Sequence, residues 1–154
     1  MQDFNEIKIF KAEEKDVSRI YEIEKECFEK DSWSEKMIKD ACCGEYGGII
    51  KAEYGEKICG FLVYTILGGD ELNIDDIAVM PENRKKGIAD AMMRYVFEKF
   101  EKSGINKIML EVRESNLPAI KLYEKYHMKK DGIRKNYYRE PVENAVLMSV
   151  DITE

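Results

Sequence analysis

The chain has 154 residues, of which 44% are hydrophobic and 36% are charged, so it has enough apolar material for the core of one compact domain. Its formal net charge is −6, which argues against a nucleic-acid partner, because phosphate binding needs a basic surface. An acidic surface instead suits a basic peptide or an amine. No apolar run approaches the ~20 residues that cross a bilayer, and the N-terminus has no secretory signal. We expect one domain over residues 1–154, in the cytoplasm and without a membrane partner.

The cysteine and histidine content bears on metal binding and on redox chemistry. Cys27, Cys42, Cys43 and Cys59 do not have the spacing of metal ligands, and His127 is the only histidine. We therefore expect no metal site, and we interpret the cysteines as reduced thiols of a cytosolic protein. His127 follows a predicted helix, and histidine tolerates positive φ better than most residues. We interpret it as a helix C-cap rather than as a catalytic group.

Hydrophobic periodicity and turn residues define the elements of the first half of the chain. A short strand is predicted over residues 7–10. One helix begins after Asp16, which is expected to be its N-cap, and a second, short helix begins after Ser34. Three strands then follow, separated by turns that contain glycine, and they predict an antiparallel meander. These strands cover residues 48–54, 58–67 and 72–80.

The second half of the chain predicts a crossover followed by a hairpin. The longest helix runs from Gly87 to Ser103 with an apolar stripe along one side, and Gly104 is expected to end it. In the strand over 107–113, side chains alternate between two faces, with Glu111 on the polar one. Asn116 is expected to cap a further helix. Strands near 132–138 and 145–152 complete the order β-α-α-β-β-β-α-β-α-β-β, an α+β domain.

The turn between the third meander strand and the longest helix has the character of an anion site. The first turn of a helix has free N–H groups and the positive end of the helix dipole. Gly87 lets a phosphate approach the backbone, and Arg84, Lys85 and Lys86 add positive charge. The pattern fits a pyrophosphate, although it is not a Walker A loop. On this segment alone, a basic helix N-terminus without a ligand is an equally good interpretation.

Two sequence motifs frame the predicted crossover. The pattern R-x-x-G-x-A occupies residues 84–89, and L-E-V-R-x-S-N-x-x-A-I-x-L-Y occupies residues 110–123. With N-Y-Y at 136–138 and W-S-E at 33–35, these motifs resemble the GCN5-related N-acetyltransferase (GNAT) family, and within it the RimI branch of ribosomal-protein-alanine N-acetyltransferases. The resemblance covers nearly the whole chain. It implies the GNAT fold, a mixed, mostly antiparallel sheet with a central β-α-β acetyl-CoA-binding unit and flanking helices.

The resemblance also implies an acetyl-CoA-dependent transfer to an amine. A protein α-amine has a pKa near ~7.7–8.0 and must lose a proton before it attacks. By resemblance, Glu111 is the general base that takes this proton, and Tyr123 is the general acid that protonates the CoA thiolate. The residues that the resemblance assigns to the cofactor are Ile77, Ala78, Val79, Arg84, Lys85, Lys86, Gly87, Ile88, Ala89, Asp90 and Asn116.

Each of these residues also has a structural interpretation. Glu111 alone could be a solvated strand residue, and Tyr123 could be a core tyrosine with its hydroxyl at the rim. Asn116 is a good N-cap, which does not exclude a ligand contact. Trp33 could fasten the second helix to the body, although it is also a candidate, with Tyr138, for lining a peptide groove.

The acceptor that the resemblance implies is the N-terminal α-amine of a protein, with ribosomal protein S18 as the best single candidate. The close alternative is the same reaction on a lysine side chain, a polyamine or another small amine. An alternative of a different class is a non-catalytic domain that binds acyl-CoA as a sensor. The presence of both Glu111 and Tyr123 argues against a sensor, which needs neither residue.

Overall fold

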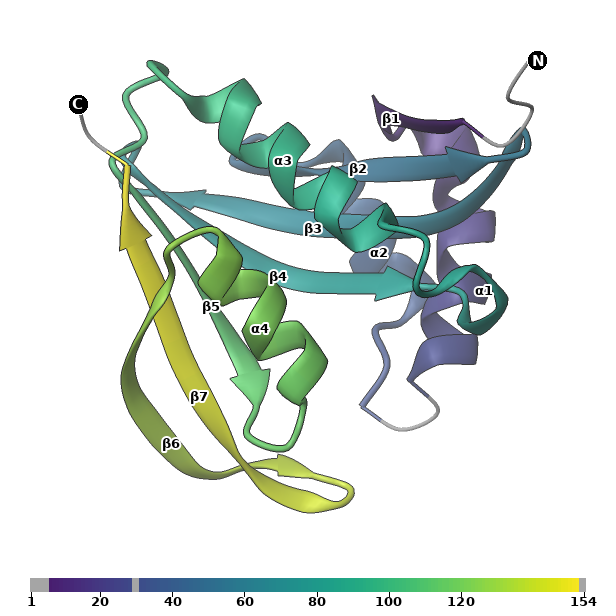
Figure 1. The fold of residues 1–154 in the computed structure, drawn as a ribbon. Coiled ribbons are helices and arrows are strands. Elements are labelled where there is room, and N and C mark those ends of the chain that lie inside the picture. The colour runs from purple at the N-terminus through teal and green to yellow at the C-terminus, as the bar shows by residue number, and fades with distance from the viewer. Residues whose placement is uncertain (1–5, 29–30, 153–154) are drawn as a thin grey trace.

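The chain forms a seven-stranded sheet with helices on both faces (Figure 1). The computed structural model describes residues 6–28 and 31–152; the prediction about a secretory signal depends on residues that lie outside these ranges. The order of strands and α-helices is the one predicted, with two short 3-10 helices added. The elements are β1 (Ile7–Lys11), α1 (Val17–Cys27), α2 (Glu35–Cys43), β2 (Gly47–Tyr54), β3 (Lys57–Leu67), β4 (Glu71–Val79), α3 (Ile88–Phe100), β5 (Lys107–Arg113), α4 (Leu117–Lys125), β6 (Lys129–Arg139) and β7 (Val142–Asp151).

The sheet has the strand order β1-β2-β3-β4-β5-β7-β6. Its neighbours are antiparallel except β4 and β5, which are parallel because α3 carries the chain back across the sheet between them. The pairing of these two strands extends only from Glu71 opposite Lys107 to Ile74 opposite Leu110. Beyond Ile74 they diverge, as Figure 1 shows. The middle of the sheet therefore opens toward the carboxyl ends of β4 and β5.

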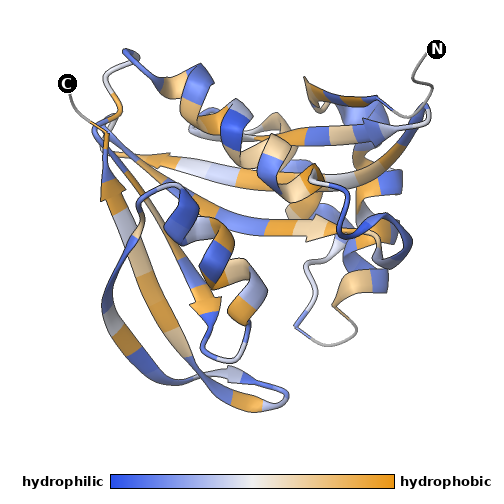
Figure 2. Cartoon of the chain, in the orientation of Figure 1, coloured by the Kyte–Doolittle hydropathy of each residue, from blue (hydrophilic) through white to orange (hydrophobic). Residues whose placement is uncertain are grey.

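Two hydrophobic cores lie on the two faces of the sheet. Helices α3 and α4 cover one face and α1 and α2 the other, and each helix carries both hydrophobic and hydrophilic residues (Figure 2). Full burial of one large apolar side chain contributes ~1.5–3 kcal/mol, so each layer is held mainly by such contacts. The first core includes Leu62, Leu72, Met92, Met93, Val96 and Ile108, and the second includes Ile20, Ile23, Ile38, Ile49, Phe61 and Val63.

A β-bulge in β4 exchanges the faces of its side chains. Val63 pairs with Asp76 and Tyr64 pairs with Ile74, so Asp75 has no opposite residue on β3. Before the bulge, Ile74 belongs to the core under α3 and α4. After the bulge the alternation is shifted by one residue. Asp76 consequently lies on the face covered by α1, just beyond the point where β4 and β5 begin to diverge.

The capping predictions for Asn116 and His127 are confirmed, and Ser34 is also an N-cap, at the start of the short helix predicted there. The Ser34 hydroxyl accepts a hydrogen bond from the N–H of Met37 at 3.1 Å, and the Asn116 side chain accepts one from Ala119 at 3.3 Å. Both residues directly precede the first residue of their helix. His127 follows α4 with φ of 67°, which is the left-handed conformation that ends many helices.

One prediction about a helix end is wrong, and another is confirmed only for the position of the cap. Helix α3 ends at Phe100 rather than near Ser103, and Gly104 lies in the turn beyond it. The carbonyl of Phe100 accepts the Ser103 hydroxyl at 2.6 Å, which satisfies one of the free groups at the helix end. Asp16 occupies the N-cap position of α1, but its side chain makes no capping bond. It pairs at 3.0 Å with the ammonium group of Lys51, which is buried and needs a counter-charge.

No helix within residues 6–28 and 31–152 is long and apolar enough to cross a membrane.

The four cysteines are free thiols, and burial raises the pKa of Cys59 and, together with neighbouring groups, that of Cys42 to about 11. Thiols with raised pKa values carry little thiolate and are weak nucleophiles at neutral pH. Cys42 and Cys59 are therefore poor candidates for an acyl carrier.

Candidate active site

A cavity of about 720 Å³ lies where β4 and β5 diverge. Its walls come from α1, the segment between α1 and α2, β4, β5, α4 and β6. Open sheets that contain parallel strands commonly hold ligands at the carboxyl ends of those strands. Six residues that the sequence singled out line this cavity: Trp33, Ile77, Glu111, Asn116, Tyr123 and Tyr138.

The divergence leaves one edge of β4 open. Pairing with β5 stops at Ile74, while pairing with β3 continues to Val79 opposite Gly60. The carbonyl of Ala78 lies toward β3, 2.8 Å from the position that a Cβ at Gly60 would take. Because backbone groups alternate along a strand, those of Ile77 and Val79 face the open side, where the Val79 carbonyl already accepts from Arg84 Nε at 3.0 Å and from the Cys27 thiol at 3.4 Å. An extended ligand with amide groups can pair with such an edge as an added strand.

The turn from β4 to α3 combines left-handed backbone with a helix N-terminus. Lys85 has φ of 64° and Gly87, the N-cap of α3, has φ of 82°. A Cβ added at Gly87 would meet no atom within 4 Å, so the space in front of this residue is open. Turns of alternating handedness direct successive N–H groups toward one point and bind anions. The backbone here fits a phosphate group.

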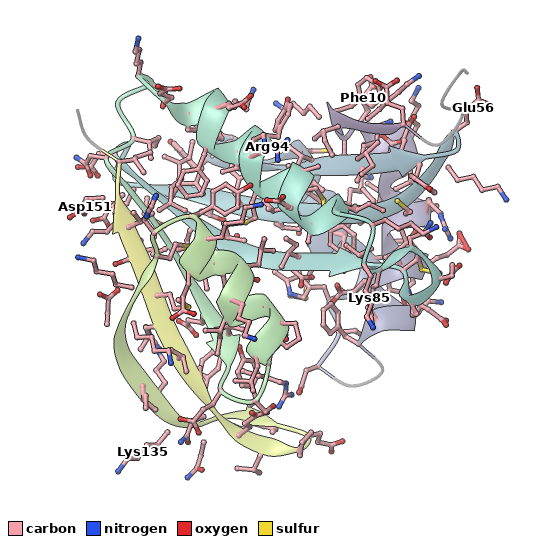
Figure 3. The ribbon with its side chains drawn as sticks, viewed as in Figure 1. Phe10, Glu56, Lys85, Arg94, Lys135 and Asp151 are labelled. Atoms are coloured by element: carbon pink, nitrogen blue, oxygen red, sulfur yellow. The ribbon has the colours of Figure 1, made fainter. Side chains whose placement is uncertain are left out.

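The charged side chains of this turn have different partners. Arg84 donates from its Nε to the carbonyl of Val79 at 3.0 Å. The ammonium of Lys86 lies 4.8 Å from the centre of the Tyr54 ring. Lys85 has no hydrogen-bond or ion-pair partner among the described residues, and its side chain lies on this turn in Figure 3. Lys85 is therefore the cation that remains free for an anionic ligand.

Asp90, in the first turn of α3, has a side chain that is already engaged. One carboxylate oxygen accepts from the ammonium of Lys125 at 2.7 Å, and the other accepts from the Tyr126 hydroxyl. These bonds hold the pKa of Asp90 below its ordinary value despite the cost of burial. The carboxylate joins α3 to α4, and only the backbone of Asp90 is available to a ligand.

Glu111 lies on β5 with its carboxylate in the cavity. Its neighbours Leu110 and Val112 are buried on the opposite face, as the alternation predicted. One oxygen, Oε1, lies 3.4 Å from the Nε of Arg134 on β6. The other oxygen, Oε2, is buried without a hydrogen-bond partner among the described residues. A buried acceptor without a donor is costly, so this oxygen is suited to receive a proton or an N–H from a ligand.

Tyr123 projects from α4 into the same cavity and is 4% exposed. Its hydroxyl makes no hydrogen bond to another described residue. Burial raises the pKa of Tyr123, and the nearby Tyr138 and Asp76 raise it further. The phenol consequently stays protonated at every physiological pH. It can donate to a negative charge that develops beside it.

Tyr138 is held by a network that the sequence did not reveal. The guanidinium of Arg113 lies 4.2 Å from the centre of the Tyr138 ring, and it pairs with Glu143 at 3.2 Å and with Asp31 at 3.6 Å. Glu143 also accepts from the N–H of Ser115 at 2.6 Å. Burial, followed by the charge of Glu111, raises the pKa of Tyr138 to about 12. The network fixes one wall of the cavity.

In addition to Glu111, the cavity wall contains a pair of carboxyl groups, those of Glu24 and Asp76. Glu24 is 1% exposed, and its Oε2 accepts from the backbone N–H of Trp33 at 2.8 Å. Burial, together with the Glu24 carboxyl, raises the pKa of Asp76 to about 9. The sequence offered one signal for this pair, because Glu24 stands in the apolar stripe of α1. Trp33 itself packs against the core under α1 and α2, so it also fastens this segment to the body.

Comparison with known proteins agrees with this architecture. The model of the acetyltransferase (GNAT) family matches residues 17–128, and the chain therefore belongs to this family of acetyltransferases. A putative ribosomal protein bS18-alanine N-acetyltransferase from Bacillus subtilis is 33% identical over 143 residues, which cover 90% of this chain and 91% of that protein. The ribosomal protein bS18-alanine N-acetyltransferase of Escherichia coli is 31% identical over 79% of this chain and 82% of its own length.

A crystal structure shows the same similarity in three dimensions. The ribosomal-protein-S18-alanine N-acetyltransferase from Escherichia coli has a TM-score of 0.89 at 30% identity, covering 97% of this chain and 96% of the other. The resemblance and the fold class predicted from the two motifs are thereby confirmed. Among the described residues, no group of three histidine, cysteine, aspartate or glutamate side chains is placed to hold a metal ion.

Proposed function

We propose that this acetyltransferase transfers the acetyl group of acetyl-CoA to the N-terminal α-amine of a protein, with ribosomal protein S18 as its first candidate substrate. The observation that carries the proposal is the cavity at the divergence of β4 and β5, where an unpartnered Glu111 oxygen and the free Tyr123 hydroxyl occur together. The names of the relatives at 31–33% identity support the substrate. The reaction would take place in the cytoplasm.

The backbone beside the cavity fits acetyl-CoA. The open edge at Ile77 and Val79 would pair with the amides of the pantetheine arm, and the turn around Gly87 would receive the pyrophosphate. Lys85 would add the positive charge, since the other cations of the turn have partners within the chain. Asn116 lines the cavity and keeps acceptor and donor capacity beyond its capping bond. Bound acetyl-CoA would supply a thioester, which an amine can attack directly.

Glu111 would act as the general base. At pH 7 roughly a tenth of an α-amine with a pKa of ~7.7–8.0 is deprotonated, so a positioned base increases the reactive fraction. Glu111 Oε2 has no hydrogen-bond partner among the described residues, and the phenol of Tyr137, whose pKa the Glu111 charge raises, lies beside the carboxylate. Arg134 Nε lies 3.4 Å from the other oxygen, Oε1, so this ion pair leaves Oε2 open to the amine. The proton can then pass from Glu111 to water.

Tyr123 would stabilise the leaving group. A CoA thiolate has a pKa near that of a free thiol, ~8.5, which is lower than that of the buried phenol. The phenol therefore acts mainly as a hydrogen-bond donor while the thiolate departs. The nitrogen would lose its second proton once the C–N bond has formed, and water would relay that proton to the thiolate, so that CoA leaves as the thiol. The raised pKa is suited to this role, because a tyrosinate would repel the thiolate.

Tyr138 and Trp33 would contact the acceptor. Both line the cavity, from β6 and from the segment between α1 and α2 respectively. An extended N-terminus that passes between them would offer side chains and main-chain amides in addition to its amine. The guanidinium of Arg113 packs against the ring of Tyr138 and holds it in place. Recognition of a peptide rather than of an isolated amine would depend on this wall.

An acceptor panel tests the proposal by thiol release from acetyl-CoA. A peptide with the N-terminal sequence of S18 should be acetylated, whereas the same peptide with a blocked α-amine should not be, even when it contains lysine. Tyr138→Ala should raise the KM for the peptide about tenfold or more, the value of one lost aromatic contact at an interface, and leave the KM for acetyl-CoA unchanged. Tyr46→Ala is the matched control, because Tyr46 is 68% exposed and does not line the cavity. Rapid acetylation of spermidine or of a blocked lysine peptide, with no reaction at free N-termini, would reject the proposed substrate.

A further inference from the structure

The carboxyl groups of Glu24 and Asp76 meet between α1 and β4. The first belongs to the last turns of α1, and the second follows the bulge of β4. Both side chains line the cavity. Glu24 Oε1 and Asp76 Oδ2 are buried, and neither has a hydrogen-bond partner in the part of the chain that the structure describes. Two facing carboxyl groups can bond to each other only if one of them keeps a proton.

The pair has no counter-cation among the described residues. The groups that face Asp76 are Glu24 and Cys27 from α1, Asp75 and the backbone N–H of Ile77 on β4 itself, and Tyr123 from α4. All of them are neutral or negative. Arg84 lies beyond Cys27, and its guanidinium donates to that thiol and to the carbonyl of Val79.

The position of the pair raises the free-energy cost of ionising both carboxyl groups. The C-terminal end of a helix carries partial negative charge, which disfavours an anion at Glu24. Burial disfavours it further. A single shared proton removes the repulsion between the two carboxyl groups and leaves one negative charge at the wall of the cavity. A buried charge that lacks a partner within the chain is expected to obtain one from a ligand.

We propose that the Glu24–Asp76 pair is the subsite that receives the acceptor amine in its ammonium form. An ammonium group has one positive charge and three N–H donors. These complement one net negative charge and two unpartnered oxygens, each of which keeps a free lone pair when the proton is shared. The bound amine would then give its proton to Glu111 before it attacks. This inference rests on the proposed function only in taking the acceptor to be an amine.

Amide substitutions test the subsite, because they preserve shape and remove charge. In Glu24→Gln the remaining Asp76 can carry the charge, and in Asp76→Asn the remaining Glu24 can carry it; in each case the new amide N–H replaces the shared proton. The double substitution leaves no charge. The control Glu35→Gln with Asp40→Asn removes two exposed carboxylates of α2 outside the cavity, a loss of two negative charges against the one that the pair carries.

Calorimetric titration of the CoA-loaded protein measures the effect with two peptides, one with a free α-amine and one with that amine acetylated. The wild type should prefer the free amine. In the double variant, the ratio of the affinity for the free peptide to that for the acetylated peptide should fall by about 10- to 100-fold, the value of hydrogen bonds to a charged group. Each single variant and the α2 control should retain most of it. All variants should keep the wild-type affinity for CoA, which verifies that they are folded.

Two results would overturn the subsite. One is a double variant that still prefers the free amine, and the other is a single variant that loses the preference as completely as the double one. Spermidine separates this inference from the proposed function. If the wild type binds spermidine but no free N-terminal peptide, and the double variant loses spermidine, the subsite stands and the peptide substrate is rejected. If the double variant binds and acetylates free N-termini normally, the subsite is rejected and the proposed function stands.

Discussion

Replacement of Glu111 by glutamine separates catalysis from stability. The change keeps the shape of the side chain and removes its negative charge. Among the described residues, the one ion pair that it breaks is that with Arg134, at 3.4 Å, in which the arginine side chain is 56% exposed. A pair of this exposure contributes about 0–1 kcal/mol to stability. The free energy of unfolding should therefore change by no more than about 1 kcal/mol.

The effect on turnover should be much larger. General-base catalysis contributes ~10²–10⁴ in rate, which corresponds to about 3–5 kcal/mol in the activation barrier. The deficit of the Glu111→Gln variant should be greatest near pH 7 and should shrink as the pH rises above the pKa of the amine, because the nucleophile then arrives already deprotonated. Affinity for acetyl-CoA should be nearly unchanged, since Glu111 is not part of the open edge or of the turn before α3.

Steady-state thiol release over pH 6–9.5, with denaturant unfolding in parallel, measures both quantities. Arg134→Gln is the matched control, because it breaks the same ion pair and leaves the carboxylate in place. Full activity of Glu111→Gln at neutral pH would refute the base assignment and make Glu111 an ordinary strand residue. A deficit that does not depend on pH would also count against it, since it would indicate a binding role instead.

Three further predictions concern other parts of the site. Gly87→Glu should abolish acetyl-CoA binding in calorimetry while the protein stays folded, because it places a carboxylate where the pyrophosphate is expected and strains a φ of 82° by about 1–2 kcal/mol; unchanged affinity would refute the assignment. Tyr123→Phe should slow turnover at least ~10-fold and change the free energy of unfolding by less than about 1 kcal/mol, because its hydroxyl makes no hydrogen bond that could be lost. For Asp76, the pKa is raised from 3.8 to about 9 in the folded chain, so the unfolded chain loses this proton first and stability falls as the pH rises between these values. Asp76→Asn should remove a slope of roughly 1 kcal/mol per pH unit from the unfolding free energy; identical slopes for both proteins would show that Asp76 is ionised in the native state.

Local sequence patterns correctly predicted the features of the fold that depend on residues close together in the chain. The alternation along β5 assigned Glu111 to the face opposite Leu110 and Val112, and the structure has the same arrangement. The caps at Ser34 and Asn116 were predictable because an N-cap bond spans only three residues. The two motifs on either side of α3 also led to the correct family.

Features that depend on distant parts of the chain were not predictable. The bulge at Asp75 arises from the register between β4 and β3, and no local sequence pattern specifies it. Regular alternation from Ile74 would place Asp76 on the face under α3 and α4, away from Glu24. The bulge places it on the other face. Gly104 was a good local candidate for ending α3, but the helix ends earlier, at the buried Phe100. The partners of Arg113 come from three separate segments, so their meeting is a tertiary property.

The short contact between β4 and β5 divides the sheet into two halves. Only four residue pairs join the half made of β1–β4 to the half made of β5–β7. In the unliganded chain, the amide protons of Ile77 and Val79 that face this seam should exchange rapidly with solvent. A ligand that pairs with the seam would act as an eighth strand and protect them. Hydrogen–deuterium exchange at these two amides is thus a direct reporter of occupancy, and it requires neither an acceptor substrate nor turnover.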